Sequence, residues 1–269
     1  MADGGASLST AGHGRVDLIS DLHDDLLREI VNRLPLRDAA RTAVVASRWR
    51  YLWRSNRLVL WDVDIPKPAR DAVVPRVLAD HLGHFHAVML YDCRLASLDH
   101  VLPDWPCLLI DKRTKKLVLA NRFTRTGPNS VRLLPADILP APTFFFPHLR
   151  ILTMTRIVIS DRDLECLIVA CPVLKALRLV INSSKHVRLR SQSLGCTLVG
   201  LSRVEEFTVT MVDTPLLERF YLLQSLNGVE VRIARAPNLR VLGYLDTIVD
   251  KLQIGDSVIA VHLSSFHPH

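Results

Sequence analysis

The stretch CPVLKALRL, Cys171–Leu179, carries a pattern that occurs three more times in the chain. FPHLRILTM (146–154), TPLLERFYL (214–222) and APNLRVLGY (236–244) also read proline, any residue, leucine, two residues, leucine or phenylalanine, any residue, apolar. The prolines are 25, 43 and 22 residues apart, and the long step is close to two units. We therefore expect a further unit with a weaker signature near Leu198–Leu201.

Periods of 20–29 residues with this leucine spacing are typical of leucine-rich repeats. Each unit would supply a short strand with alternating inward leucines and a helical or irregular return, and neighbours would stack into a solenoid with parallel strands. DRDLECLIVACP (161–172) predicts a return helix whose Leu164, Leu167 and Ile168 share a face. HAVMLY (86–91) and KLVLA (116–120) are weaker candidates for earlier strands. An ordinary α/β domain with chance leucines explains four in-phase matches less well.

The N-terminal part, from Asp17 to about Asn56, has a helical period instead. Its first apolar stripe consists of Leu26, Leu27, Ile30, Val31 and Leu34. Pro35 is expected to end this helix and to open a second one. The second would carry Leu36, Ala39, Ala40 and Ala43, and a third would carry Val45, Trp49, Leu52 and Trp53.

Three short helices within ~40 residues lie near the lower limit for independent folding. The segment contains neither a disulfide pattern nor a metal-ligand set, and its apolar side chains exceed what three helices can hide from one another. Docking on the rest of the chain and binding to a partner are both open on these grounds.

The predicted organisation is a disordered lead over 1–15, the helical unit over 16–57 and a Pro-rich connector over 58–75. The leucine-rich repeats follow over 76–255, and an irregular tail over 256–269 contains VIAVHL as a possible last strand. The fold class is α/β, with a three-helix unit followed by a solenoid of short parallel strands and return helices.

Composition and charge leave the function open. The net charge of +7 and two basic clusters, 111–116 and Arg48 to Arg57, lack an aromatic base-stacking pattern, so we expect no nucleic-acid partner. Five cysteines without a C-x-x-C pair favour a reducing compartment, with Cys166 and Cys171 as core residues. No signal peptide or membrane span is expected, which predicts a soluble intracellular protein.

Catalytic and metal-binding signatures are missing from the sequence: it has no H-E-x-x-H, G-x-S-x-G, P-loop or G-x-G-x-x-G motif. His81, His84 and His86 lack a completing cysteine or carboxylate, and we expect them on the surface of a return helix. Asp161 and Asp163 fit a helix N-cap better than a carboxylate pair. The sequence predicts a binding protein without cofactor or metal.

DLISDLHDDLLREIVNRLPLRDAARTAVVASRWRYLW (17–53) resembles an F-box of the large plant family of F-box proteins with leucine-rich repeats. The matching features are D-x-I-S-x-L, D-D-L-L-x-x-I, L-P-L-R-D-A-x-R-T and S-R-W-R-x-L-W. DRDLECLIVACPVLKALRL and APNLRVLGYLD are similar to the same family, so the resemblance covers about residues 17–255. His23 stands where the family usually has proline, which predicts a slightly weaker helix start. The family commonly continues beyond this length into an FBD-type region.

The resemblance implies a substrate-receptor subunit of an SCF-type ubiquitin ligase, in the cytoplasm and/or nucleus. The F-box would bind a Skp-type adaptor and through it cullin and RING subunits, and the repeats would bind a protein substrate, without catalysis. An adaptor-binding protein that presents no substrate is the alternative. Trp49 is expected as the main anchor to the adaptor. The implied adaptor-binding residues are Leu22, Leu26, Leu27, Ile30, Leu34, Pro35, Leu36, Val45, Trp49, Leu52 and Trp53.

Overall fold

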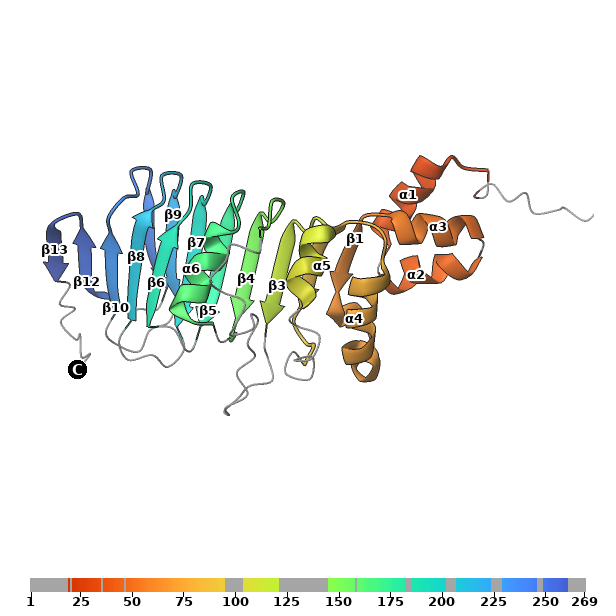
Figure 1. Cartoon of the computed structure of the whole chain (residues 1–269), viewed down its shortest axis with the longest axis horizontal. Helices are drawn as coiled ribbons and strands as arrows, with labels where there is room; N and C mark the ends of the chain where they lie inside the picture. The colour runs from red at the N-terminus through yellow and green to blue at the C-terminus, as the bar shows by residue number, and fades with distance from the viewer. Residues whose placement is uncertain are drawn as a thin grey trace, which may run out of the picture.

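The computed structural model describes residues 19, 21–34, 36–45, 47–94, 104–120, 145–157, 159–181, 185–201, 207–223, 229–245 and 249–260. It is an elongated α/β molecule, with three helices at one end and stacked parallel strands along the rest (Figure 1). This confirms the predicted fold class. The expected disordered lead over 1–15 lies outside the described residues.

The N-terminal unit consists of the short helices α1 (Asp24–Arg33), α2 (Leu36–Val45) and α3 (Ser47–Ser55). Each helix is amphipathic, and their inward stripes meet in a small core formed by Leu27, Val31, Ala39, Trp49 and Leu52. Val45 was expected in the third helix but is the last residue of α2. Since α3 begins only at Ser47, the apolar run before it extends the second helix.

Eight parallel strands form the main sheet, in the order β1-β2-β3-β4-β5-β7-β9-β11. Their bounds are β1 Leu58–Trp61, β2 Phe85–Leu90, β3 Lys116–Ala120, β4 Ile151–Thr155, β5 Ala176–Ile181, β7 Cys196–Leu201, β9 Arg219–Leu223 and β11 Val241–Leu245. The four proline-aligned repeats supply β4, β5, β9 and β11, and the two weaker early candidates supply β2 and β3. The expected fifth unit is β7, whose inward Thr197 replaces the leucine or phenylalanine of its neighbours.

The segment expected as a Pro-rich connector, 58–75, is folded into the repeat domain, so this prediction was wrong. It contains β1, the 3-10 turns η1 (Asp62–Asp64) and η2 (Lys67–Ala69), and the start of helix α4 (Arg70–Asp80). Pro75 lies inside α4, although proline in a helix interior is unfavourable because it cannot donate a backbone hydrogen bond. Burial of Val74 and Leu78 against the solenoid core outweighs that penalty. The repeat sheet therefore begins at Leu58 and not at residue 76.

The segments that return between the strands of the main sheet form a second layer, which consists of helices in its first part and of strands in its last part. Figure 1 shows α5 (Trp105–Asp111) and α6 (Asp161–Val169) on one face of the main sheet, as expected for return helices. Further along, the returns are strands of a five-stranded sheet in the order β13-β12-β10-β8-β6, which the sequence reading missed. Their bounds are β6 His186–Arg190, β8 Phe207–Asp213, β10 Val229–Ile233, β12 Val249–Ile254 and β13 Ser257–Ala260.

The C-terminal tail expected to be irregular over 256–269 begins with a strand. β13 pairs antiparallel with β12 through a tight turn at Gly255, whose φ of 55° lies in the left-handed region that glycine adopts without strain. This strand contains the start of the VIAVHL stretch considered as a last strand, and residues 261–269 lie outside the described part.

One continuous apolar core lies between the two layers. Alternate residues of the main strands, such as Leu152, Leu177 and Phe220, point inward and are at most 2% exposed. From the other layer, Leu164, Leu167 and Ile168 of α6 meet them, as the helical pattern predicted. Each buried leucine contributes about 1.5–3 kcal/mol, and no single repeat buries its inner face alone.

Candidate protein-binding site

The three N-terminal helices leave large apolar side chains in solvent after their core is filled. Leu26 and Ile30, one turn apart on α1, are 55% and 38% exposed, and Val44 on α2 is 83% exposed. Tyr51 on α3 is 63% exposed. Leu22, Leu34 and Trp53 are half-buried at the margin of the core. Exposed apolar side chains on every helix of one small unit favour a protein-binding surface.

The eleven residues predicted to bind an adaptor divide into groups by burial. Leu27 and Leu52 are fully buried, and Trp49 is only 8% exposed. The indole expected as the main anchor therefore packs inside the three-helix unit, where it fills the space between three short helices, while Trp53 lies at the margin of this core. Pro35 lies outside the described residues, and Leu36 and Val45 belong to α2.

Two exposed apolar residues were missed by the sequence reading, Val44 and Tyr51. Val44 directly follows the alanine stripe of α2, and Tyr51 lies between Arg50 and Leu52 on α3. Both residues lie outside the apolar stripes that face the core. This position could have indicated their exposure, because an apolar residue on the polar face of a short helix does not pack against the other helices.

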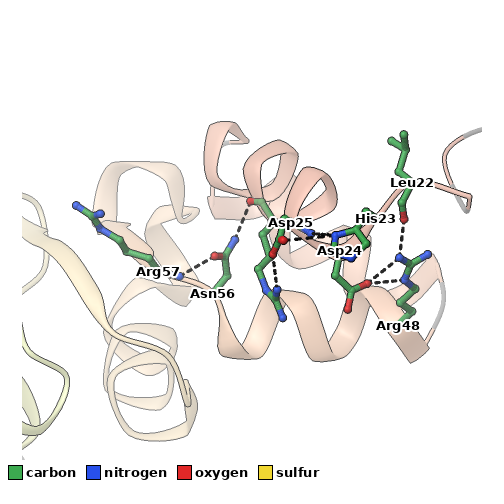
Figure 2. A network of polar contacts seen from close by, with 8 residues as sticks. Leu22, His23, Asp24, Asp25, Arg48, Asn56 and Arg57 are labelled. Atoms are coloured by element: carbon green, nitrogen blue, oxygen red, sulfur yellow. Dashed lines mark hydrogen bonds and ion pairs between the residues drawn. The ribbon is translucent and has the colours of Figure 1, made fainter.

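The start of α1 is fixed by a polar network shown in Figure 2. His23, where the family usually has proline, is the N-cap, and its Nδ1 accepts a hydrogen bond from the Asp25 backbone N–H at 3.4 Å. Proline could not provide this bond, so the helix start gains a cap in place of a favourable first residue. Asp24 and Asp25 lie in the first turn, where the helix dipole favours negative charge.

Arg48 connects this helix start to α3. Its guanidinium donates to the Asp24 carboxylate at 2.7 and 2.8 Å and to the Leu22 carbonyl at 2.5 Å (Figure 2). The pair is 40% exposed on both sides, so solvent screening keeps its contribution below about 1 kcal/mol. Its effect is to connect the start of α1 to α3.

The helical unit joins the solenoid without a linker, through Asn56. The Asn56 side chain donates to the Arg28 carbonyl of α1 at 3.0 Å and accepts from the Arg57 N–H at 2.9 Å (Figure 2). Its backbone carbonyl accepts from His81 Nε2 at 2.9 Å, and Gly83 N–H donates to the Arg54 carbonyl. The end of α3 is thus hydrogen-bonded to both α1 and the turn before β2, which fixes the helices on the end of the repeat sheet.

His81 is the buried centre of this junction, at 5% exposure. Its ring packs between Trp53 and Phe85, with centroid distances of 5.6 and 5.4 Å. Burial lowers the His81 pKa, and the nearby Lys112 ammonium lowers it further, against the hydrogen bond to Asn56. The expectation of a surface histidine on a return helix was therefore wrong for His81, which follows α4 and lies in the core.

The structure gives His84 and His86 no shared role with His81. His84 is exposed in the turn before β2, and His86 lies on β2 in contact with Arg57. Over the described ranges, no group of three or more histidine, cysteine, aspartate or glutamate side chains is arranged to hold a metal ion. Asp161 and Asp163 are first-turn residues of α6, and the capping oxygen is Ser160 Oγ, at 3.1 Å from Asp163 N.

The five cysteines are free thiols. Cys171 is buried, as expected, and burial raises its pKa to about 12. Cys93 is also buried, and burial together with Asp71 raises its pKa. Cys166 is exposed on the outer side of α6, so its expected core position was wrong. Within the described residues, no helix is long and apolar enough to cross a membrane.

Comparison with known proteins agrees with this architecture. Residues 102–266 match the family model "FBD-associated F-box protein At5g56370, LRR repeats", and residues 19–61 match the F-box domain. The chain belongs to the plant F-box/leucine-rich-repeat family. This confirms the resemblance found in the sequence, and the helices α1–α3 with β1 are its F-box region.

Among Arabidopsis thaliana relatives, the F-box/FBD/LRR-repeat protein At1g13570 is 30% identical over 61% of this chain and 44% of its own length. The putative F-box/LRR-repeat protein At5g02930 is 24% identical over 94% of this chain and 53% of its own. F-box/LRR-repeat protein 13 is 29% identical over 88% and 58%. The chain thus spans about half the length of the curated relatives it matches. No solved structure matches the chain significantly.

Proposed function

We propose that this F-box/leucine-rich-repeat protein is a substrate-receptor subunit of an SCF-type ubiquitin ligase, acting in the cytoplasm and/or nucleus. The F-box binds a Skp-type adaptor, which connects it to cullin and RING subunits, and the repeats bind a protein substrate. Proteins of this family are generally non-catalytic adaptors, and we assign the same role to this chain.

The observation that carries the proposal is the incomplete burial of the F-box. Its core contains five buried apolar residues, whereas Leu26, Ile30, Val44 and Tyr51 remain in solvent. Burial of one large apolar side chain against a partner contributes about 1.5–3 kcal/mol. An adaptor that covers Leu26 and Ile30 on α1 would therefore gain affinity without disturbing Leu27 and Trp49 inside.

The junction supports the second part of the proposal. Asn56, His81 and Gly83 fix the F-box on the first repeat, so a substrate on the solenoid is held at a defined position relative to the adaptor. Holding both partners in one assembly raises the effective concentration of an acceptor lysine to about the mM range, without catalysis by this chain.

The test is co-expression with a Skp-type adaptor and size-exclusion chromatography of the product. We expect a stoichiometric complex for the wild type and none for Leu26→Asn/Ile30→Asn. The matched control is Val169→Asn/Leu216→Asn, which changes two equally exposed apolar residues of the solenoid and should leave the complex intact. A folded wild type that stays monomeric beside the adaptor would refute the proposal.

The alternative is a protein that binds the adaptor without presenting a substrate. Co-purification with a cullin together with loss of a client protein on induction supports the receptor role. Adaptor and cullin binding without loss of any client supports the alternative.

A further inference from the structure

The outward face of the main sheet carries positive charge, and among the described residues of its strands no acidic side chain balances it. The parallel register sets one residue of each strand side by side, so rows of side chains cross the sheet. One row runs from Val59 through Lys116 and Ile151 to Arg219. The next runs from Trp61 through Thr153 and Arg178 to Tyr221. Neither row contains aspartate or glutamate, and their charged members are Lys116, Arg178 and Arg219.

A second set of basic side chains lines the edge where β1 to β5 begin, and we call it the basic edge: the four cations Arg57, Lys115, Arg150 and Lys175, with the imidazole of His86. Backbone hydrogen bonds place three of them side by side, because Arg150 N–H donates to the Lys115 carbonyl and Lys175 N–H to the Arg150 carbonyl. Arg57 Nη2 contacts His86 Nδ1 on the neighbouring strand.

The surroundings of His86 show that these charges lie close together. Partial burial lowers the His86 pKa, and the positive charges of Arg57, Lys115 and Lys116 lower it further. In the part of the chain that the structure describes, Lys115, Lys116, Arg150 and Lys175 form no ion pair or side-chain hydrogen bond. Glu218 occupies the corresponding place directly before β9, which confines the basic edge to β1–β5.

Exposed apolar side chains lie on the same face. Val59 on β1 and Ile151 on β4, in the row next to the basic edge, are 41% and 38% exposed, and Trp61 at the far end of β1 is 42% exposed. On β2 and β3, between these strands, Ala87 and Val118 of the same rows are buried, so the exposed apolar side chains lie on β1 and β4 and not across the whole face. No helix or strand among the described residues packs over the exposed ones, since α4 to α6 and the second sheet lie on the opposite face of the main sheet (Figure 1).

We propose that the basic edge and the adjoining Val59, Trp61 and Ile151 bind an extended acidic segment of the substrate protein, with carboxylates on the cations and apolar side chains on the rows beside them. The proposal rests on the receptor function above and specifies its substrate. Neighbouring strands are about 4.8 Å apart, so β1 to β5 span roughly 19 Å, the length of about six extended residues. The site has one exposed aromatic side chain, Trp61, whereas single-stranded nucleic acids stack successive bases on several aromatic residues, so the site fits a peptide better.

The experiment begins with a random peptide library displayed on phage and panned against the immobilised full chain. We expect enriched peptides to be rich in aspartate, glutamate and aliphatic residues. Enrichment of neutral or basic peptides, or no enrichment at all, would overturn the proposal.

The Kd of the most enriched peptide is then measured by fluorescence anisotropy. Arg150→Glu/Lys175→Glu should weaken binding at least ~10-fold, because the reversed charges repel the carboxylates. Arg162→Glu/Lys185→Glu is the matched control, with the same change in net charge at exposed positions on the other layer, and should stay within about 2-fold. Equal weakening by both double variants would overturn the assignment of the site.

A short single-stranded oligonucleotide of mixed sequence serves as the competing ligand class. The proposal fails if it binds more tightly than the peptide and loses affinity in the edge variant. Adaptor binding of the same variants is measured separately. Peptide binding without an adaptor complex refutes only the ligase function, whereas an adaptor complex without selection of acidic peptides refutes only this site.

Discussion

The F-box and the solenoid use their apolar residues in opposite ways. In the F-box, three helices of nine or ten residues enclose five buried apolar side chains and leave Leu26, Ile30 and Val44 in solvent. In the solenoid, a single core runs from Leu58 to Val231, and both layers contribute to it along its whole length. Three short helices can each turn only one stripe inward, whereas stacked repeats bury alternate residues of every strand.

This difference in packing predicts that the solenoid and the F-box obtain their stability from different sources. The solenoid completes its own core by stacking, so its stability is internal to it. The F-box gains stability from two outside sources, the junction around His81 and, in the proposed function, the adaptor. Changes in the F-box core, at the junction and on the exposed F-box surface should therefore have separable effects.

The largest effect is expected from Trp49→Ala. Removing this buried indole should reduce the free energy of unfolding of the F-box by about 3–5 kcal/mol, because three short helices cannot close the cavity. Hydrogen exchange should show lost protection in α1–α3 and retained protection in β4, β5 and β7. Val44→Ala, at an 83% exposed position of the same unit, is the control that should change little. Equal loss of protection along the whole chain would show that the two parts are one cooperative unit.

Gly83→Ala should reduce the free energy of unfolding of the F-box by about 3 kcal/mol, nearly as much as Trp49→Ala. An added Cβ at Gly83 would lie 2.1 Å from the Asn56 carbonyl oxygen, a backbone atom that accepts the His81 hydrogen bond. The junction would have to open, and the F-box should then unfold at a lower temperature than the solenoid. Thermal unfolding followed by circular dichroism measures this.

Gly195→Ala is the matched control for the junction, since the nearest atoms to its added Cβ are 3.7 and 3.8 Å away. We expect a melting temperature close to that of the wild type. If Gly83→Ala behaves like Gly195→Ala, the junction is not the rigid attachment inferred from its hydrogen bonds.

A smaller effect should come from the protonation of His81. The folded state lowers the His81 pKa through burial, so the unfolded chain takes up a proton first as the pH falls below about 6.5. The stability that neutral His81 provides is therefore complete above this pH and decreases on acidification towards the lower folded pKa. Urea unfolding between about pH 7 and pH 5 should show this decrease.

His81→Phe tests the origin of that slope. It retains an aromatic ring beside Trp53 and Phe85 but loses the proton and the bond to Asn56. The variant should be less stable than the wild type at neutral pH by about 1 kcal/mol, and the gap should narrow on acidification. Parallel pH profiles would assign the slope to other groups, such as His86.

Much of the solenoid could be predicted because its repeat signature reports directly on burial. The leucine spacing located β4, β5, β9 and β11, and the step of 43 residues located β7. The strand returns were missed although VEVRI (229–233) alternates between apolar and polar residues, because the one clear return, α6, suggested helices throughout. The fold of 58–75 does not follow from its sequence, because its prolines favour a connector, whereas burial of Val74 and Leu78 stabilises a helix around Pro75.

The sequence predicts which residues belong to the candidate site, but not which of them point inward and which are exposed. The sequence motif placed Leu26, Leu27 and Trp49 together on the F-box, but two adjacent leucines of one helix look alike in sequence. Which of them points inward depends on how α1 is rotated against α3, and this rotation is set by the packing of Trp49 and Leu52 and by the Arg48 contacts.

The smallest effect is expected at Leu26, and its neighbour Leu27 makes the comparison sharp. Leu26→Ala should change the free energy of unfolding by less than about 0.5 kcal/mol, since its side chain is 55% exposed. Leu27→Ala, one residue along the same helix and fully buried, should cost about 2–5 kcal/mol. Urea unfolding of the two variants measures the difference. If Leu26→Ala lowers the free energy of unfolding as much as Leu27→Ala, Leu26 stabilises the isolated chain. The exposed F-box surface would then not be specific to a partner.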